Sequence, residues 1–383
     1  MQVVVSKKDL LRVLGRCQGV ADRKSTMPAL GNVLLEVKAP DRLRIAATDL
    51  HLAVSGTINA EVQTPGSVAV GARDIFERVR MMPDGPLAIS VGANAATTIR
   101  AVGSARRFTL HGMPGSEFPS LPEPEPELPV LSLDARALSR LITATHFSIS
   151  TDDTRLHLNS ALFEWEGESV RMVTTDGHRL SKMDLLARGK QASASFLIPL
   201  KGVLELKRLC DESAQEARGE AAGEPYEVRI VQSGPNAFFE LSGLRFSVKL
   251  VDAQFPPYQQ VIPEQSEHSV RAPRLELADA LKAVSVAAND RTGGIKLSLS
   301  ESKMRFESES PESGQGFDEF PVDYVGSEIT IGFNARYFLD VLNAVEDDEV
   351  MLGISGELDP VVIRPATASG DSTYLAVVMP MRI

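Results

Sequence analysis

The sequence contains only two cysteines, Cys17 and Cys210, which lie far apart and form no CxxC motif. A disulfide framework or a zinc site therefore does not fit this chain, and a reduced cytoplasmic protein is expected. Long apolar runs are also missing, so no segment of about 18 residues is predicted to span a membrane. The N-terminal residues lack the basic, apolar and small-residue order of a signal peptide.

Aromatic residues are scarce as well, at 5% of the chain, with Trp165 as the single tryptophan. The remaining composition, 43% hydrophobic and 24% charged, is that of a soluble globular protein. A length of 383 residues suits two or three domains, each with a modest core. We expect Trp165 to be structural, at a strand end before a turn, and the two cysteines to be buried fillers.

Positive charge is in deficit, because the formal net charge is -11. A protein that holds nucleic acid by bulk electrostatic attraction is expected to be basic, so this balance argues against that class. The distribution of the charges therefore matters more than their sum.

An internal repeat is the most informative feature that is present. A short strand, a turn of two or three residues and an amphipathic helix recur in segments that begin at Ser67, Ser195 and Glu328. In the second copy the polar residues 211–225 follow the helix, and we expect a solvated loop insertion there.

A second type of helix also recurs, over residues 6–20, 133–147 and 275–289, each time followed by a strand. In the first two copies a strand–turn–strand hairpin with a central Thr-Asp comes next, whereas the third copy is degenerate there. Each third of the chain thus reads helix, strands, helix, strands. The alternative of three unrelated α+β domains is disfavoured by the matching order and by the repeated Thr-Asp and Phe-Pro pairs.

These repeats predict an α+β protein of three domains, over residues 1–125, 126–262 and 263–383. Residues 118–129 and 256–269 are rich in proline and polar residues, which favours extended linkers between the domains.

The basic residues gather on helix faces, at spacings of four or seven that return a side chain to one side of a helix. Amphipathic helices commonly expose Lys and Arg to solvent, but equivalent faces in two repeats favour a shared role. If the repeats surround an axis, these faces would line a channel and contact phosphates without reading sequence. The residues are Lys8, Arg12, Arg16, Arg73, Arg80, Arg136, Arg140, Lys201 and Arg208.

A cluster in the second hairpin, Asp176, His178 and Arg179 around Gly177, invites a catalytic interpretation. Two residues of spacing place Asp176 and His178 on one face of a strand. However, no third orienting group, metal-ligand set or phosphate-binding glycine loop lies nearby. Catalysis by this pair is therefore disfavoured.

The first repeat helps to separate the parts of this cluster. It retains the Thr-Asp and the histidine but has leucines where the second repeat has Gly177 and Arg179. We therefore predict that Asp176 makes an Asx-type hydrogen bond in the hairpin turn, and that Gly177 and Arg179 carry the function.

Six segments in order along the whole chain match one family. They are STMPALGNVLLEV, TTDGHRLS, LKGVLELKRL, FSVKLVDAQFPPY, IGFNARYFLDVLNA and VVMPMRI. On these motifs the sequence resembles the bacterial β sliding clamp family, the processivity subunit of the replicative DNA polymerase III holoenzyme.

The resemblance implies three clamp domains, each with two helices packed on antiparallel sheet, and a head-to-tail dimer that closes a ring of six domains. Duplex DNA would pass through the hole without sequence-specific contacts, while the ring tethers the polymerase for processive synthesis. The family implies no catalytic activity, cofactor or metal. Implied partners are the polymerase α subunit, the clamp-loader δ subunit, other polymerases, and mismatch-repair or ligase proteins, in a cytoplasmic, nucleoid-associated protein.

The resemblance further implies a groove between domains 2 and 3 that accepts short, extended, largely apolar peptides. Flexible methionines and branched aliphatic residues suit an adaptable pocket of this kind. Its expected wall is Leu158, Thr175, Gly177, His178, Arg179, Leu180, Pro256, Val261, Asn334, Tyr337, Leu358, Pro360, Val377, Val378, Met379, Pro380, Met381 and Arg382. Of these, His178 and Arg179 are expected to supply polar contacts at the rim.

Two more sets of residues follow from the resemblance. Lys24 and His157 join the basic helix residues named above as DNA-facing positions. The expected dimer interface comprises Arg106, Arg107, Phe108, Leu110, Val286, Ala287, Asp318 and Glu319.

Several positions depart from the family pattern. Gln260 stands where an arginine is expected, and Asp74 stands where a lysine is expected. Leu156 and His157 replace two tyrosines of a DNA-facing loop, which lowers the expectation of base stacking there. A repeat scaffold that binds partners through the groove without encircling DNA is the alternative function, because no single motif encodes ring closure.

Overall fold

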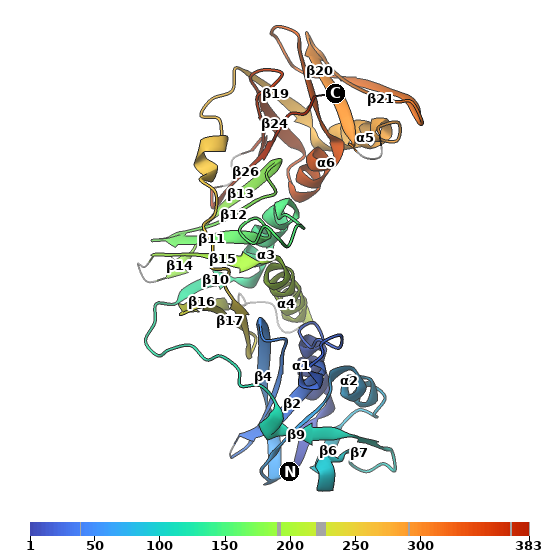
Figure 1. Cartoon of the computed structure of the whole chain (residues 1–383), viewed down its shortest axis with the longest axis vertical. Coiled ribbons are helices and arrows are strands. Elements are labelled where there is room, and N and C mark those ends of the chain that lie inside the picture. The colour runs from blue at the N-terminus through green and yellow to red at the C-terminus, as the bar shows by residue number, and fades with distance from the viewer. Residues whose placement is uncertain (39, 190–192, 220–226, 290–291, 368–369, 383) are drawn as a thin grey trace. The chain divides into compact units, whose positions relative to one another are not determined.

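The computed structural model describes residues 1–38, 40–189, 193–219, 227–289, 292–367 and 370–382 (Figure 1). The chain folds into two compact units, which are described separately below. The first unit joins residues 1–138 to 204–250, and the second joins residues 139–203 to 251–383. Two helices, α3 (Ala135–Thr145) and α4 (Leu200–Gly219), span the division.

The first unit contains the first repeat and part of the second. Its remaining elements are β1 (Gln2–Ser6), α1 (Lys7–Cys17), η1 (Pro28–Gly31), β2 (Asn32–Lys38), β3 (Arg42–Thr48), β4 (Leu52–Thr64), β5 (Ser67–Gly71), α2 (Ala72–Arg80), β6 (Pro86–Val91), η2 (Ala93–Ala95), β7 (Thr97–Ala101), β8 (Arg107–Leu110), β9 (Gly112–Pro114), η3 (Gly115–Glu117), β10 (Leu131–Asp134), β16 (Glu227–Ser233), β17 (Asn236–Leu241) and β18 (Leu244–Lys249).

The second unit contains the rest of the second repeat and the third. Its remaining elements are η4 (His146–Ser148), β11 (Ser160–Glu166), β12 (Ser169–Thr175), β13 (Arg179–Leu186), β14 (Arg188–Gly189), β15 (Ser193–Pro199), η5 (Tyr258–Val261), β19 (His268–Pro273), α5 (Arg274–Ser285), β20 (Gly294–Ser300), β21 (Lys303–Ser310), β22 (Gly314–Pro321), β23 (Ile329–Asn334), α6 (Ala335–Ala344), β24 (Glu349–Ile354), β25 (Val361–Pro365) and β26 (Ser372–Val378).

Strand pairing confirms the threefold repeat. One four-stranded antiparallel order occurs three times, as β5-β2-β3-β4, β15-β11-β12-β13 and β23-β20-β21-β22. A second order also occurs three times, as β1-β6-β7-β8, β10-β16-β17-β18 and β19-β24-β25-β26. The domain boundaries predicted from the sequence follow these repeats and stay a prediction, since the two units divide the second repeat.

Neighbouring repeats are joined by antiparallel pairing between outer strands of these sheets. In the first unit β18 pairs with β4, with Phe246 opposite Val54. In the second unit β26 pairs with β13, with Ala376 opposite Ser181. Both joints use the last strand of one repeat and the last strand of a hairpin from another, so the joint itself is repeated.

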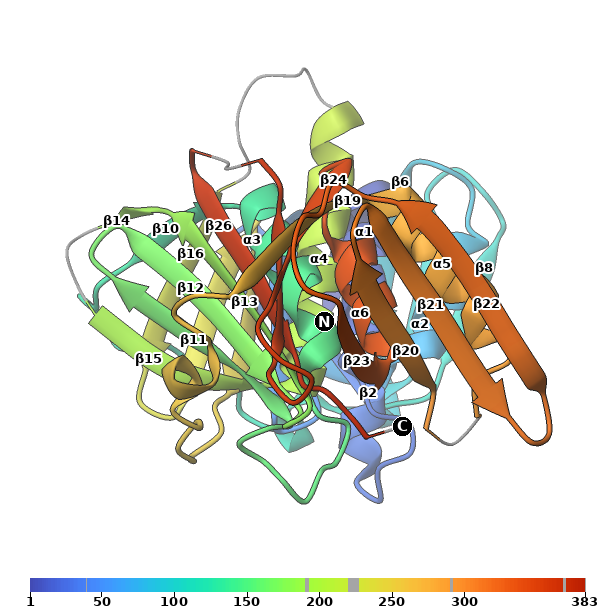
Figure 2. The same cartoon turned by 90° about the horizontal axis from the view of Figure 1, so that it is seen from above.

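The helices bury their apolar faces on the sheets, as the predicted amphipathic pattern requires. Helix α1 begins after Ser6, whose hydroxyl accepts a hydrogen bond from the Asp9 N–H, and it buries Leu10 and Leu14. In the third repeat α5 and α6 pack on each other and against the sheet of β20–β23 (Figure 2). Phe333 and Phe338 lie in that core with ring centroids 4.0 Å apart.

Residues 211–225 differ from the predicted loop insertion. Helix α4 continues through residue 219, and residues 220–226 lie outside the described residues. The extension is rich in Ala, Glu and Gln, which favour helix, and pairs at i,i+4 spacing support its start. Lys207 contacts Asp211 at 2.7 Å, and Arg208 contacts Glu212 at 2.5 Å.

The second linker also differs from a purely extended chain, because η5 forms a short helical turn within it. Cys17 and Cys210 are fully buried, as predicted, and burial raises the pKa of Cys17 to about 12. Trp165 is buried near the end of β11, and its indole N–H donates to the Gly167 carbonyl, which confirms a structural role. Among the described residues, no helix is long and apolar enough to cross a membrane.

The Thr-Asp hairpin turn has the same hydrogen bonds in both repeats, which confirms the predicted Asx-type role. Asp176 Oδ1 accepts from the His178 and Arg179 N–H groups at 2.9 and 3.0 Å. Asp49 Oδ1 accepts from the two corresponding N–H groups of the first repeat at 2.9 and 2.5 Å. The residue after each Asp has a positive φ, which glycine adopts freely at 93° in Gly177 but which Leu50 adopts at 75°.

Replacing Asp49 should show how much this turn stabilises the first repeat. Asp49→Ala removes the acceptor of two backbone N–H groups and should lower the free energy of unfolding by about 2 kcal/mol. Asp49→Asn keeps an oxygen acceptor and should cost less than half of that. Urea denaturation followed by circular dichroism measures both, with the exposed Asp41→Ala as a control expected within about 0.5 kcal/mol of wild type. Equal losses in all three variants would contradict this role.

Candidate functional site

An apolar pocket of about 230 Å³ lies in the second unit. Nine residues predicted for the peptide groove line it: Leu158, Thr175, Gly177, Arg179, Leu180, Pro256, Val261, Val377 and Met379. The pocket thus brings together residues from four separate stretches of the chain. Its mostly aliphatic lining suits an apolar ligand segment.

Three structural elements build the pocket walls. The β12–β13 hairpin supplies Thr175 to Leu180, with Gly177 exposed at the tip. The linker supplies Pro256 and Pro257 together with residues of the turn η5, and β26 supplies Val377, with Met379 directly after it. The Met379 N–H donates to the His178 carbonyl at 2.9 Å, which extends the β13–β26 pairing up to the hairpin tip.

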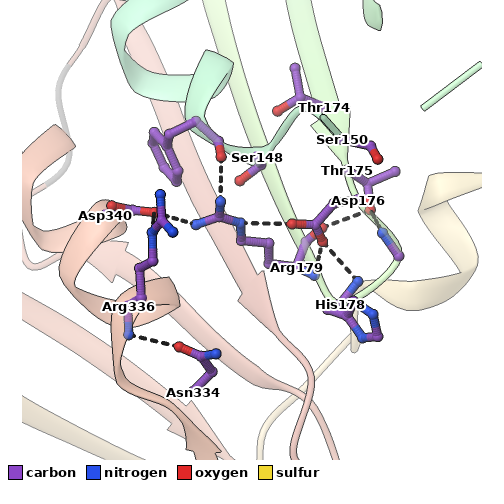
Figure 3. Close-up of polar contacts among 12 residues, drawn as sticks. Ser148, Ser150, Thr174, Thr175, Asp176, His178, Arg179, Asn334, Arg336 and Asp340 are labelled. Carbon is purple, nitrogen blue, oxygen red and sulfur yellow. Dashed lines mark hydrogen bonds and ion pairs between the residues drawn. The ribbon is translucent and has the colours of Figure 1, made fainter. Parts of the chain in front are cut away.

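Arg179 is the centre of the polar contacts behind the pocket (Figure 3). Its Nε donates to Asp176 Oδ2 at 3.0 Å, and its Nη1 donates to Asp340 Oδ2 at 2.6 Å. Its Nη2 donates to the Phe147 carbonyl, and the guanidinium lies over the Tyr337 ring at 4.6 Å. The guanidinium therefore joins the second-repeat hairpin to helix α6 of the third repeat.

The buried position of Arg179 corrects the prediction that it supplies a polar contact at the rim. The residue is only 9% exposed, and its guanidinium hydrogen-bonds groups of the protein itself. A buried guanidinium is stable only when charged and polar partners satisfy it, and two carboxylates do so here. Arg179 thus lines the pocket with its guanidinium bound by the protein itself, while His178 is exposed.

The remaining predicted wall residues lie outside the lining of this pocket. His178 stacks on Tyr337 with ring centroids 6.5 Å apart, and burial raises the pKa of Tyr337. The Met381 N–H donates to the Gly332 carbonyl. Val378 is fully buried in the third-repeat core and is not among the residues that line this pocket. The others are half-buried or exposed: Asn334, Leu358, Pro360, Pro380 and Arg382.

Three lining residues, Pro257, Tyr258 and Gln260, were not among the predicted wall residues, although the departure from arginine at Gln260 concerned a polar contact of the groove. All three lie between Pro256 and Val261, which were both predicted. A linker read as extended chain presents alternate residues, whereas the η5 turn brings most of the segment to the pocket. The proline pair before it was the available signal for a turn.

The geometry around Asp176 does not form an acid–base pair with His178. Both carboxylate oxygens of Asp176 accept hydrogen bonds from the hairpin and from Arg179. The His178 ring instead faces Tyr337. In the described part of the chain, no group of three or more His, Cys, Asp or Glu residues is arranged to hold a metal ion.

Most of the predicted DNA-facing cations are exposed: Lys8, Arg12, Lys24, Arg73, Arg80, Arg136, Arg140 and Lys201. His157 is half-buried. Several of the exposed ones have neighbours within the chain, as where Arg73 Nε contacts Glu77 at 2.6 Å and Arg140 donates to the Ser372 hydroxyl at 3.1 Å.

The structure buries Arg16, which contradicts its DNA-facing prediction, and it leaves Arg208 partly exposed. Arg16 is 2% exposed, and its Nε lies 3.6 Å from Glu212. Successive residues of an α-helix are rotated by about 100° around its axis, so residues four apart differ in direction by about 40°. Over the eight residues from Lys8 to Arg16 this difference doubles, and Arg16 no longer lies on the face of Lys8. Arg208 is half-buried, pairs with Glu205 and Glu212 at 2.5 Å each, and donates to the Arg16 carbonyl.

The residues expected at the dimer interface lie on two sheet edges. Arg106, Arg107, Phe108 and Leu110 lie in or just before β8, which in the described residues pairs with β7 alone. Asp318 and Glu319 lie in β22, which pairs there with β21 alone. Beside β22, Val286 at the end of α5 is 81% exposed, whereas Ala287 is buried.

Comparison with known proteins gives one consistent result. Three family models match in series, described as the DNA polymerase III beta subunit N-terminal domain (residues 1–122), central domain (132–257) and C-terminal domain (259–382). The chain is 33% identical to the beta sliding clamp of Escherichia coli K12 over 384 residues, covering 100% of both chains.

Solved structures agree with this match. The chain resembles the DNA polymerase III beta subunit of Pseudomonas aeruginosa with a TM-score of 0.91 and 32% identity, covering 100% of both chains. It also resembles a Pseudomonas aeruginosa sliding clamp bound to griselimycin, with a TM-score of 0.90, 31% identity and 100% coverage of both chains.

Replacing Arg179 tests whether it holds this site together. Arg179→Ala leaves two carboxylates without their shared cation and should lower the free energy of unfolding by about 3 kcal/mol. Arg336→Ala is the matched control, because Arg336 is 83% exposed, lies 4.0 Å from the same Asp340, and should cost less than about 0.5 kcal/mol. Chemical denaturation of both variants makes the comparison, and similar losses would show that Arg179 has no special role.

Proposed function

The chain belongs to the beta sliding clamp family, the beta subunit of DNA polymerase III, and on that premise we propose that two copies close head to tail into a ring around duplex DNA. In this proposal the ring slides along DNA, tethers the replicative polymerase, and performs no catalysis of its own. Retention is topological, so a net charge of -11 is compatible with DNA binding.

The observation that carries this proposal is the repeated sheet joint. Strand β18 pairs with β4, and β26 pairs with β13, while the corresponding strands β8 and β22 have no such partner in the described residues. Exposed strand edges present unpaired N–H and C=O groups that favour pairing with another chain. In a dimer, β22 of each copy would pair with β8 of the other copy. Two more joints of the same kind would therefore form, one at each contact between the copies.

The repeats predict the register of this third joint. The strand pairings can be followed across each sheet, from the strand before the first helix of a repeat to the last strand. This shows that Phe108 of β8 occupies the same position as Phe246 of β18 and Ala376 of β26. The partners of Phe246 and Ala376 are Val54 and Ser181.

Following the pairings across the other type of sheet in the same way shows that Gly316 of β22 occupies the same position as Val54 of β4 and Ser181 of β13. Phe108 should therefore lie opposite Gly316 of the second copy, and Arg106 opposite Asp318. A side chain at residue 316 would approach Ala287 within 3.2 Å, so glycine there leaves the phenyl ring room against the end of α5. The opposite charges of Arg106 and Asp318 would stabilise the same register.

The exposed basic residues support weak, sequence-independent contact with phosphates inside the ring. Lys8 and Arg12 share one face of α1, and Arg136 and Arg140 are exposed on α3. Because Arg16 and Arg208 are bound to glutamates, this chain offers fewer cations than the sequence pattern predicted. Weak contact of this kind allows sliding, and it is sensitive to salt.

The apolar pocket supports binding of short peptides from the polymerase α subunit, the loader δ subunit and repair proteins. Its lining combines aliphatic side chains with Met379, whose flexible thioether adapts to different ligand shapes. A scaffold that binds these peptides without encircling DNA is the competing function.

Retention on DNA distinguishes the two functions. A clamp loaded on nicked circular DNA by a loader and ATP should remain bound through gel filtration, whereas on linear DNA it should slide off. Cutting the loaded circle with a restriction enzyme should release it. Equal retention on both forms would support the non-encircling scaffold instead.

The interface itself is tested by Val286→Asp. Val286 is so exposed that the change should not affect folding, but a carboxylate buried without a partner in the joint should weaken dimerisation at least about 100-fold. Light scattering after gel filtration should then show a monomer. Leu186→Asp, an equivalent change at a 63% exposed site outside the predicted interface, should leave the dimer intact. A stable dimer of the Val286→Asp variant would refute the predicted joint.

A further inference from the structure

One wall of the pocket is a short linker turn, η5, rather than a strand or long helix. Such a turn has few hydrogen bonds of its own, here Gln260 N–H to the Pro257 carbonyl at 3.1 Å and Ile262 N–H to the Gln259 carbonyl at 3.4 Å. Something outside the turn must therefore fix its position. The only strongly buried side chain of this turn is Tyr258, which is 4% exposed.

Tyr258 connects the pocket to a different surface of the same sheet. Its ring lines the pocket and packs in a small core with Leu162, Val173 and Leu180. Its hydroxyl points out of that core, donates to Glu164 Oε2 at 2.9 Å and accepts from Arg171 Nη1 at 3.0 Å.

Glu164 and Arg171 do not line the pocket. They belong to a separate depression of about 230 Å³ that also includes Trp165 and Ser195. Tyr258 lines the pocket, whereas Glu164 and Arg171, which hold its hydroxyl, do not.

These two residues begin a polar row that crosses four strands in register. Glu164 of β11 lies opposite Arg171 of β12. Arg171 lies in turn opposite Asp184 of β13, and Asp184 lies opposite Thr373 of β26. Arg171 Nε donates to Asp184 Oδ1, and Thr373 Oγ1 donates to Asp184 Oδ2 at 2.9 Å. Lys182 Nζ also donates to that oxygen at 2.6 Å.

The protonation of this row favours its hydrogen bonds. Burial alone would raise the pKa of Asp184, but hydrogen bonds from Lys182 and Arg171 outweigh it and lower the pKa. Burial and the hydrogen bond to Glu164 raise the pKa of Tyr258, so its hydroxyl keeps the proton that it donates. Cross-strand ion pairs join Glu164 to Arg171 and Arg171 to Asp184, and the Thr373 hydroxyl holds Asp184 by a hydrogen bond.

We propose that the row Glu164–Arg171–Asp184 positions the pocket wall through the Tyr258 hydroxyl and thereby sets how long a bound peptide stays. The proposal rests on the peptide-binding function proposed above. None of these three residues lines the pocket, so they are positioning residues. Because the row crosses β13–β26, it also couples the wall to the joint between the second and third repeats.

Tyr258→Phe is the direct test, because it keeps the ring in the pocket and removes only the hydroxyl. A fluorescein-labelled peptide carrying the clamp-binding segment of the polymerase α subunit serves as the probe. Loss of a hydrogen bond to a carboxylate should loosen the wall, raise the dissociation rate about five- to tenfold and leave the association rate within about twofold. Glu164→Gln, which keeps the shape and an oxygen acceptor, should give a smaller effect in the same direction.

Backbone amide hydrogen exchange of the protein alone is a second measurement. It requires no bound peptide, so it remains informative even if the protein binds none. The amides of Gln260 and Ile262 should exchange faster in Tyr258→Phe than in wild type. Glu240→Gln is the matched control, because Glu240 pairs with Arg245 at 2.9 Å across strands β17 and β18 of the other unit. It should change neither the exchange at these two amides nor the peptide dissociation rate.

The outcomes separate this proposal from the proposed function. Unchanged exchange and unchanged dissociation in Tyr258→Phe would overturn the positioning role. Faster dissociation with unchanged exchange would also overturn it, since the hydroxyl would then act on the ligand itself. If the wild-type chain bound no peptide while exchange still rose in the variant, the peptide-binding function would fail and the positioning of the turn would stand.

Discussion

This structure depends on one constraint: the backbone N–H and C=O groups at the edge of a β-sheet need hydrogen-bond partners. Each repeat ends in strands whose outer N–H and C=O groups would otherwise be exposed, and pairing them is the way two repeats are joined in each unit. In the described part of the chain, three repeats form two such joints, and the strands that correspond to the joined ones, β8 and β22, each pair on one side only. The proposed dimer follows from this count, because two copies that meet head to tail can pair both β8 edges with both β22 edges.

The functional pocket depends on the same pairing. Where β26 joins β13, the tip of the second-repeat hairpin meets the start of helix α6, and Arg179 balances one carboxylate from each side. The first repeat has an equivalent hairpin with the same Asx turn, but leucine replaces both the glycine and the arginine there. The repeat thus supplies a common frame, and two substitutions within it distinguish the hairpin that carries the pocket.

Sequence patterns predicted the repeats, the helix faces and the Asx turn because these depend on local periodicity and hydrogen bonding. They failed where tertiary contacts decide. Arg16 matches the spacing of Lys8 and Arg12, yet it is buried beside Glu212, which lies in a helical extension where a solvated loop was predicted. The proposed positioning role of Tyr258 could not be predicted from the sequence, since it depends on Glu164 and Arg171, 94 and 87 positions away in the chain.

The central claim is that β8 of one copy pairs with β22 of another, and a disulfide cross-link tests it most directly. The predicted register places Thr109 opposite Gln315, at a Cα separation of about 4.5 to 5.5 Å that a disulfide can bridge. The two native cysteines are buried and should not interfere. Oxidation of a Thr109→Cys, Gln315→Cys variant should yield a covalent dimer on a non-reducing gel, whereas Thr109→Cys with Glu319→Cys, shifted by four residues, should remain monomeric on that gel. Absence of the first cross-link, or equal yields from both variants, would contradict the account.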